Sequence, residues 1–334
     1  MKANHKSNHI RSAVGLGLAI LALGAEAAPR TFVSTLGSDA NPCSLASPCR
    51  AFQAAINAVD AGGEVVALDS GGYGTMTITK SVAVIVPPGV HAAITANGVD
   101  GVYVNAPGIA VALRGLYLSG TGTVGHGIRY KQGTTLHIEN CVINGFSAFG
   151  YAGISHESGG DMFVKDTISR NNGTGIGIAP FSAAITSLHR VRVENNSGGG
   201  IEVGGPAHVT VRDSVSAHNT SSNFSANAPS SGGINTYLTI ENSAAVGSMF
   251  GIAAGAGGVT GSSYVRVVDS VVAYNTSYGL AASTNGVIVV ANSTVTQNAT
   301  GLLASGGGII RSYTTNRVFN NTVNGAPTNT LTPL

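Results

Sequence analysis

The sequence predicts an all-β solenoid, in which short strands stack in successive coils. One motif recurs irregularly between residues 136 and 308. It consists of a β-rich run, usually Asn or Asp, a small residue and another short strand, followed by Gly-Ile or Gly-Leu. Forty-seven glycines, no tryptophan and only 10% charged residues disfavour long helices and favour many short strands with tight turns.

The spacing of the Asn or Asp positions gives the coil length. Neighbouring members of this column lie about 23 to 29 residues apart, the range of a β-solenoid with three short strands per coil. A left-handed hexapeptide helix needs a strict six-residue apolar period, which is absent, and a leucine-rich repeat needs more leucines at fixed offsets. The column consists of Asn140, Asp166, His189 (a departure), Asp213, Asn242, Asp269, Asn292 and Asn316.

Residues 1–27 are typical of a secretory signal peptide. Three basic residues precede an apolar run over 13–23, and Ala25-Glu26-Ala27 fits the small-x-small cleavage pattern. The apolar run is too short to span a bilayer. We therefore expect a secreted or periplasmic protein, cleaved after Ala27, with no membrane span after signal removal.

The mature chain is expected to be electrically neutral. The full chain has 17 basic and 15 acidic residues, and removal of residues 1–27 takes away three and one, which leaves 14 of each. A neutral chain argues against a nucleic-acid partner, because such binding needs a basic face. We expect a monomer without a cofactor.

The three cysteines have different expected states. Cys43 and Cys49 lie six residues apart in a loop of an exported chain, so we expect a disulfide that fixes the entry to the domain. Its small loop limits the entropic gain to about 2 kcal/mol. Cys141 is interpreted as a small core or turn residue.

An amphipathic helix is expected between the cysteine loop and Gly62-Gly63. Ser47 is its expected cap and Pro48 its first turn, and the apolar residues of 52–59 recur at helical spacing. This helix, followed by the stretch AGGEVVALDSGGYG, resembles the opening of right-handed parallel β-helix proteins of the pectin lyase-like superfamily. The resemblance covers about residues 50 to 323, and it implies a right-handed parallel β-helix whose apolar end is covered by a short N-terminal capping α-helix.

Four regions follow from this interpretation. They are a signal peptide at 1–27, an N-terminal cap with disulfide loop and helix at 28–63, the parallel β-helix at 64–324 and a polar tail at 325–334. Residues 220–231 read as a polar, loop-like insertion that overhangs one face, a common place for binding in solenoids.

The remaining repeated residues are interpreted as turn chemistry. The second Asn column is expected to combine left-handed turns with amide hydrogen bonds between coils, although its members, such as Asn172, Asn275 and Asn298, often stand in glycosylation sequons. The glycine before each Ile or Leu is expected to mark a sharp turn. The column consists of Asn172, Asn195, Asn219, Asn275 and Asn298.

Outward-facing positions supply the candidate site. Alternate residues after each Gly-Ile pair are expected to point outward, which makes one face polar over the early coils and featureless over the late ones. Glu157 and Glu202 would lie two coils apart, about 10 Å between backbones, near the separation of an inverting carboxylate pair. The catalytic candidates are Arg129, Lys131, Glu157 and Glu202; the ligand-binding candidates are Asn235 and Tyr237.

A second outward column carries alternating charges, and cross-strand pairing explains it. It contains Glu139, Lys165, Arg212 and Glu241. Scattered tyrosines near the candidate face, namely Tyr130, Tyr151 and Tyr237, keep carbohydrate binding open.

Known catalytic signatures are incomplete. Gly125-His126-Gly127 is similar to an element of the polygalacturonases, but the Asp-Asp pair of that family is missing and Arg129-Tyr130-Lys131 lies too close. The acidic residues do not form the aspartate cluster by which pectate lyases of this fold bind Ca²⁺, and no zinc or phosphate-loop motif is present. We expect no metal.

The sequence therefore predicts an exported β-helix scaffold without a recognisable catalytic site. Its partner is expected to be a polysaccharide, a cell-envelope component or a protein, bound along one β-face. The alternative is a polysaccharide lyase or glycoside hydrolase of the same superfamily.

Overall fold

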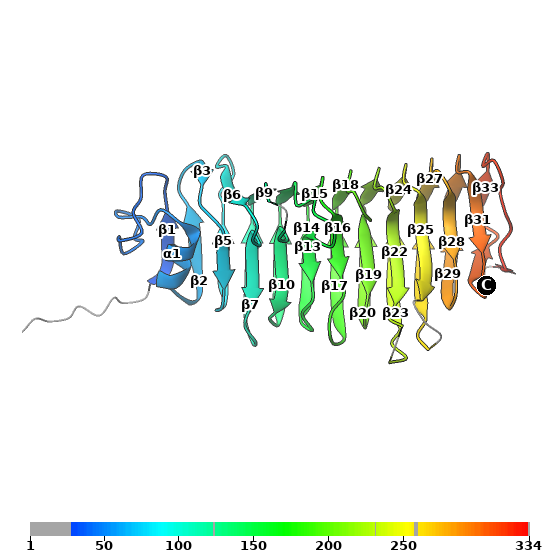
Figure 1. The fold of residues 1–334 in the computed structure, drawn as a ribbon, viewed down its shortest axis with the longest axis horizontal. Coiled ribbons are helices and arrows are strands. Elements are labelled where there is room, and N and C mark those ends of the chain that lie inside the picture. Colours follow the sequence, from blue (N-terminus) through cyan, green and yellow to red (C-terminus); the bar gives the residue numbers. More distant parts are fainter. Residues whose placement is uncertain (1–27, 123, 231, 257–259, 333–334) are drawn as a thin grey trace, which may run out of the picture.

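The computed structural model describes residues 28–122, 124–230, 232–256 and 260–332, and they form a parallel β-solenoid with one short helix. Figure 1 shows the strands stacked along the long axis, from the blue end, where α1 (Phe52–Ala58) lies, to the red end. Each full coil contributes one strand to each of three sheets, which we call A, B and C. The all-β class and the solenoid are thus confirmed.

Sheet A is the longest, with 13 strands among the described residues. In spatial order it contains β1 (Ala28–Val33), β2 (Val59–Ala67), β5 (Val82–Ile85), β8 (Ala110–Arg114), β11 (Thr135–Glu139), β14 (Asp161–Lys165), β17 (Ala184–His189), β20 (Ala207–Arg212), β23 (Thr236–Glu241), β26 (Ser263–Val268), β29 (Gly286–Ala291), β32 (Ile309–Tyr313) and β34 (Asn329–Leu331).

Sheet B follows sheet A across a tight turn in most coils. Its strands are β3 (Gly71–Gly72), β6 (Ala92–Ala96), β9 (Tyr117–Gly120), β12 (Val142–Asn144), β15 (Ile168–Arg170), β18 (Arg192–Glu194), β21 (Val215–Ala217), β24 (Ala244–Val246), β27 (Val271–Ala273), β30 (Thr294–Thr296) and β33 (Arg317–Phe319).

Sheet C completes each coil before the chain enters sheet A again. Its strands are β4 (Met76–Ile78), β7 (Val102–Asn105), β10 (Ile128–Gln132), β13 (Ala152–His156), β16 (Thr174–Ile178), β19 (Ile201–Gly204), β22 (Ser222–Ala228), β25 (Phe250–Ala256), β28 (Tyr278–Ala282) and β31 (Thr300–Ala304).

The core is a set of apolar columns along the solenoid axis. The parallel register of sheet C places equivalent side chains directly over one another, so that each buried rung packs on the next. One such column contains Ile128, Ile154, Ile176, Ile201, Phe224, Ile252, Leu280 and Leu302, all of them buried.

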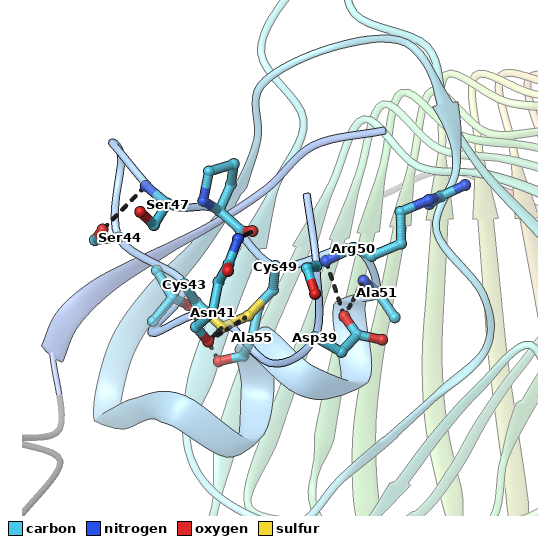
Figure 2. The surroundings of a disulfide bond; sticks show 12 residues. Asp39, Asn41, Cys43, Ser44, Ser47, Cys49, Arg50, Ala51 and Ala55 are labelled. Carbon is cyan, nitrogen blue, oxygen red and sulfur yellow. Dashed lines mark hydrogen bonds between the residues drawn. A yellow bond between two sulfur atoms is a disulfide. The ribbon is translucent and has the colours of Figure 1, made fainter. Parts of the chain in front are cut away.

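The N-terminal helix is shorter than expected. It begins at Phe52 with Ala51 as its cap, and it ends before Val59, so Gly62 and Gly63 lie inside β2. The expected cap at Ser47 is wrong, because the Asp39 carboxylate holds the entry by accepting hydrogen bonds from the backbone N–H groups of Arg50 and Ala51 at 2.8 Å each (Figure 2). The helix still covers the apolar end through its buried Phe52 and Ile56.

The disulfide between Cys43 and Cys49 is present and buried (Figure 2). The loop that it closes is fastened to β1, since Phe32 donates its backbone N–H to the Cys43 carbonyl and accepts that of Cys49, and Ser34 donates to the Cys49 carbonyl. A disulfide of this kind fits an extracellular protein. The expected signal peptide at 1–27 lies outside the described residues, and no helix within them is long and apolar enough to cross a membrane.

From β8 to β30, each turn between sheets A and B has one left-handed residue. Six members of the first column, Asn140 among them, have φ near 50°, as expected for Asn and Asp. The departure is at Arg190, with φ of 50°, and not at His189, which is the last residue of β17. Asn316 was also assigned to the wrong column. Its side chain accepts the backbone N–H of Ser293, the residue after Asn292, so Asn316 belongs to the neighbouring column, which consists mainly of Ser and Thr.

The interior asparagine ladder is confirmed, but one assigned member was wrong, and the expected left-handed backbone belongs to the residue before each ladder residue. Asn195 is a left-handed turn residue, and the buried rung is its neighbour Asn196. Each ladder side chain accepts a backbone N–H from the coil before it, as Asn196 Oδ1 does from Asn172 at 2.9 Å. The sequon residues Asn172, Asn275 and Asn298 are therefore structural, with at most 2% of their surface exposed.

The glycines before Ile or Leu do not form turns. At Gly251 an added Cβ would lie 2.5 Å from Val272 Cγ1 and 2.6 Å from the Gly279 carbonyl oxygen. These residues lie within sheet C and face the core beside the Asn ladder, where no side chain fits. The exception is Gly233, which has a φ of 61° in the turn before β23.

Residues 220–231 are not an insertion. They contain β22, a regular strand of sheet C in which the buried Phe224 replaces the usual Ile and pairs in register with Ile201 and Ile252. The expectation failed because Asn223-Phe224 stands where the other coils have Gly-Ile. The solenoid also extends past both expected boundaries, since β1 and β34 are the edge strands of sheet A.

Candidate functional site

The outer face of sheet C carries a long groove. Three cavities of about 460, 360 and 360 Å³ follow one another along it. The first and second share Tyr151, and the second and third share Glu202 and Asn227. The groove therefore runs from Gln53, on α1, to Ser305, beyond β31.

One outward column of sheet C forms the floor of the groove, and its side chains change in size and charge from coil to coil. In register along sheet C, the outward position after Arg129 is Ser155, followed by Gly177 and Glu202. Later coils present Ser225, Ala253 and Leu303 at this position. The structure thus places the charged residues in the early coils, as expected, and among the described lining residues of the late cavity only Glu202 is charged.

Glu157 is the centre of an ion-pair cluster. Its carboxylate accepts hydrogen bonds from Arg129 Nε and Lys131 Nζ at 2.7 Å each, and from Ser155 Oγ at 3.2 Å. Burial alone would raise the pKa of Glu157, but the bonds from Arg129 and Lys131 outweigh it and lower the pKa to about 2. Glu157 is therefore ionised at neutral pH, and it has no proton to donate as a general acid.

A second polar cluster surrounds His126, where the first and middle cavities of the groove meet. Asp100 accepts the His126 backbone N–H at 2.7 Å, and its other oxygen lies 3.8 Å from Arg129. The imidazole Nδ1 accepts the Ala152 N–H, so the neutral ring carries its proton on Nε2. Burial lowers the pKa of His126. Its ring packs 5.1 Å from that of Tyr151, which makes the pair a mixed apolar and donor surface in the groove.

Glu202 lies two coils from Glu157, as expected from the spacing, and both line the middle cavity. Glu202 accepts a hydrogen bond from Thr174 Oγ1 at 3.2 Å. The structure thus brings Arg129, Lys131 and Glu157 into contact and leaves Glu202 apart. No group of three or more His, Cys, Asp or Glu residues in the described part of the chain is placed to hold a metal ion.

The other two candidate residues do not belong to this groove. Tyr237 lies on β23 of sheet A, and Asn235 lies in the turn before it, because the true sheet C strand of that coil is β22. The structure also excludes Tyr130 as a surface ring, since its side chain is fully buried and stacks on His156.

Several groove residues were missed by sequence reasoning. Asp100 and Tyr103 come from the coil before the first recognised repeat, and Asn227 lies on the strand that was taken for an insertion. A register search anchored on the inward residues Val102, Ile128 and Phe224 would have found them.

Residues 100–258 match the family model described as "Right handed beta helix region". Together with the three-sheet solenoid, this match confirms the expected right-handed parallel β-helix fold. No curated protein matches the chain.

Solved structures with related folds share little sequence with this chain. The crystal structure of pectate lyase Pel9A is 16% identical, with a TM-score of 0.49, and the match covers 90% of this chain and 79% of that one. A rhamnogalacturonan lyase is 13% identical, with a TM-score of 0.43 and coverage of 79% and 87%. The GH136 lacto-N-biosidase from Eubacterium ramulus is 11% identical, with a TM-score of 0.47 and coverage of 91% and 67%.

Proposed function

We propose that this chain is an exported scaffold that binds a neutral glycan chain along the groove of sheet C. The single observation that carries the proposal is the succession of three adjacent cavities along sheet C, in which each neighbouring pair shares lining residues. An extended groove on a rigid, stacked scaffold suits a polymer, because each coil lengthens the groove by one strand spacing, about 4.8 Å.

The charges of the groove favour a neutral polymer. Arg129 and Lys131 both contact Glu157, and Arg129 also lies near Asp100. Arg129 is the one arginine or lysine among the described lining residues, and Lys131 lies beside the cavities. Asp100 and Glu157 compensate both, and Glu202 adds a further negative charge. An acidic polymer would have to displace Glu157 from two hydrogen bonds. A neutral sugar can use the same polar atoms together with Tyr151 and the Nε2–H of His126.

The state of Glu157 supports binding over catalysis. With a pKa of about 2 it does not donate a proton, and its two cations are engaged. The alternative, a polysaccharide lyase or glycoside hydrolase that uses Arg129, Lys131, Glu157 and Glu202, requires this cluster to open when substrate enters.

One experiment distinguishes the two functions. Chain 28–334 is run in native gels that contain neutral or acidic polysaccharides, and the same mixtures are assayed for new reducing ends and unsaturated products. We expect retardation by a neutral polysaccharide without product. Tyr151→Ala should weaken the retardation several-fold, while the matched control Tyr264→Ala, which removes the same ring from sheet A, should not.

Three outcomes would overturn the proposal. They are equal retardation of both variants, retardation by acidic polymers only, and product formation that Glu157→Gln abolishes. The last outcome would establish the lyase or hydrolase instead.

A further inference from the structure

A further cavity, of about 600 Å³, lies on the outer face of sheet A over the later coils. Its floor is β29, where Val287, Val289 and Ala291 all face outward and are half-buried. An outward strand face without a polar side chain is unusual on a solvated sheet. We call this region the sheet A trough.

Large side chains form the walls of the trough. The register places Tyr264 and Arg266 of β26 beside Val287 and Val289, and Arg311 of β32 on the other side of Val289. Since neighbouring strands lie about 4.8 Å apart, the two walls are separated by roughly 10 Å. This width admits one flat ring between them, over the valines.

One wall ends a stack of aromatic rings. The rings of His208 and Tyr237 lie 4.6 Å apart, and those of Tyr237 and Tyr264 lie 5.2 Å apart at an interplanar angle of 12°. The next residue in register is Val287, so the stack stops and one face of the Tyr264 ring is turned toward the trough. A planar ring placed over Val287 would continue the stack at an ordinary spacing.

The trough also holds an uncompensated cation. Arg30, Arg114 and Arg212 of the same sheet are paired with Glu64, Glu139 and Glu241. Arg266, by contrast, has no hydrogen-bond or ion-pair partner among the residues that the structure describes, and neither has Arg311 in the opposite wall; the register neighbours of Arg266 are Thr239 and Val289. An exposed guanidinium beside an apolar floor is a recognition element for a carboxylate or sulfonate.

We propose that the sheet A trough binds a flat aromatic ligand that carries an anionic group. The ring stacks on Tyr264 over Val287 and Val289, and the anion pairs with Arg266. The volume lies within the range of about 300–1,000 Å³ that small-molecule sites occupy. An aromatic ring fits better than a sugar, because the valine floor offers no partner for hydroxyl groups. The site is separate from the groove and does not depend on the proposed function.

Two dyes with the same ring body test this site on chain 28–334. The anionic dye is anilinonaphthalene sulfonate and the neutral dye is N-phenylnaphthylamine, and binding is measured by fluorescence titration. We expect the wild type to bind the anionic dye more tightly. Arg266→Gln should weaken the anionic dye about tenfold and leave the neutral dye unchanged, whereas Tyr264→Leu should weaken both.

The matched control is Arg317→Gln, which removes the same charge from sheet B at the same end of the solenoid. It should change neither titration. The proposal is overturned if Arg266→Gln and Arg317→Gln behave alike, if the wild type prefers the neutral dye, or if Tyr264→Leu binds both dyes normally while its circular dichroism spectrum is unchanged.

Discussion

The groove of sheet C and the trough of sheet A are built on the same solenoid, yet they differ in how their cations are compensated. In the groove, Arg129 and Lys131 share the carboxylate of Glu157. In the trough, Arg266 faces an apolar floor and has no partner among the described residues. One scaffold can therefore present a neutral surface and a cationic one, since each outward position can change without altering the inward columns.

The two sheets also differ in what supports them from inside. Sheet C has glycines beside the Asn ladder, whereas sheet A is backed by larger residues such as Leu238 and Val265. Gly251→Val should therefore give the largest effect, because its new side chain would overlap Val272 and the Gly279 carbonyl. We expect a loss of more than about 3 kcal/mol in the free energy of unfolding, or failure to fold.

The matched control is Ala253→Val, two residues further on β25, where the side chain faces the groove. It should change the free energy of unfolding by less than about 0.5 kcal/mol. Urea unfolding followed by circular dichroism measures both variants. Equal midpoints for the two variants would contradict the assignment of inward and outward faces.

In the folded controls Cys141 should resist thiol reagents, since burial raises its pKa to about 12.

A second comparison uses one carboxylate from each face. Glu157→Gln leaves Arg129 and Lys131 without their half-buried partner, and we expect it to lower the free energy of unfolding by about 1–3 kcal/mol. Glu241→Gln breaks the exposed pair with Arg212 and should cost less than about 0.5 kcal/mol. Chemical denaturation at about pH 7 measures the free energy of unfolding of both variants. A larger loss for Glu241→Gln than for Glu157→Gln would contradict the expected ranking.

The same pair of variants separates in its pH dependence. The pKa of Glu157 is lowered on folding to about 2, so its contribution is fully present above the unfolded pKa of about 4.3 and is lost as the pH falls toward 2. We expect wild type to lose more stability than Glu157→Gln between pH 5 and pH 2, each value being approximate. Parallel curves for the two proteins would show that Glu157 is not ion-paired in solution.

Salt should give the smallest effect and should act on one face only. Raising NaCl from about 50 to about 500 mM screens an exposed guanidinium, so the anionic dye should bind the trough a few-fold more weakly. Retardation by a neutral polysaccharide should stay unchanged, because the groove ligand carries no charge. If salt weakened binding of the glycan and not of the dye, the assignment of the neutral ligand to the groove and the anionic ligand to the trough would be wrong.

Much of the fold followed from the sequence, because strand alternation and coil length are local properties. The outward direction of Arg129 and Glu202 came from alternation alone. The asparagine ladder was assigned one residue off at Asn195, since the left-handed residue and the inward rung are adjacent and both are Asn in that coil. Strand β22 was missed because Phe224 fills the core where other coils have Ile.

The trough was out of reach of sequence reasoning. In β29 the outward Val287 and Val289 alternate with inward valine and isoleucine, so the strand has no polar face to mark its exposed side. The missing partner of Arg266 depends on its neighbours in other coils, which only the register provides. The contact of Lys131 with Glu157 likewise joins residues 26 apart in the sequence.

The asparagine ladder has a consequence for how the molecule comes apart. Asn298 donates its backbone N–H to the Asn321 side chain, at the end that α1 and the disulfide do not cover. If the last coil unfolds, Asn298 loses this acceptor and its coil becomes the new end of the solenoid. That coil is then as exposed as the last one was before it unfolded. Unfolding is thus expected to begin by fraying at the C-terminal end and to proceed coil by coil toward the N-terminus.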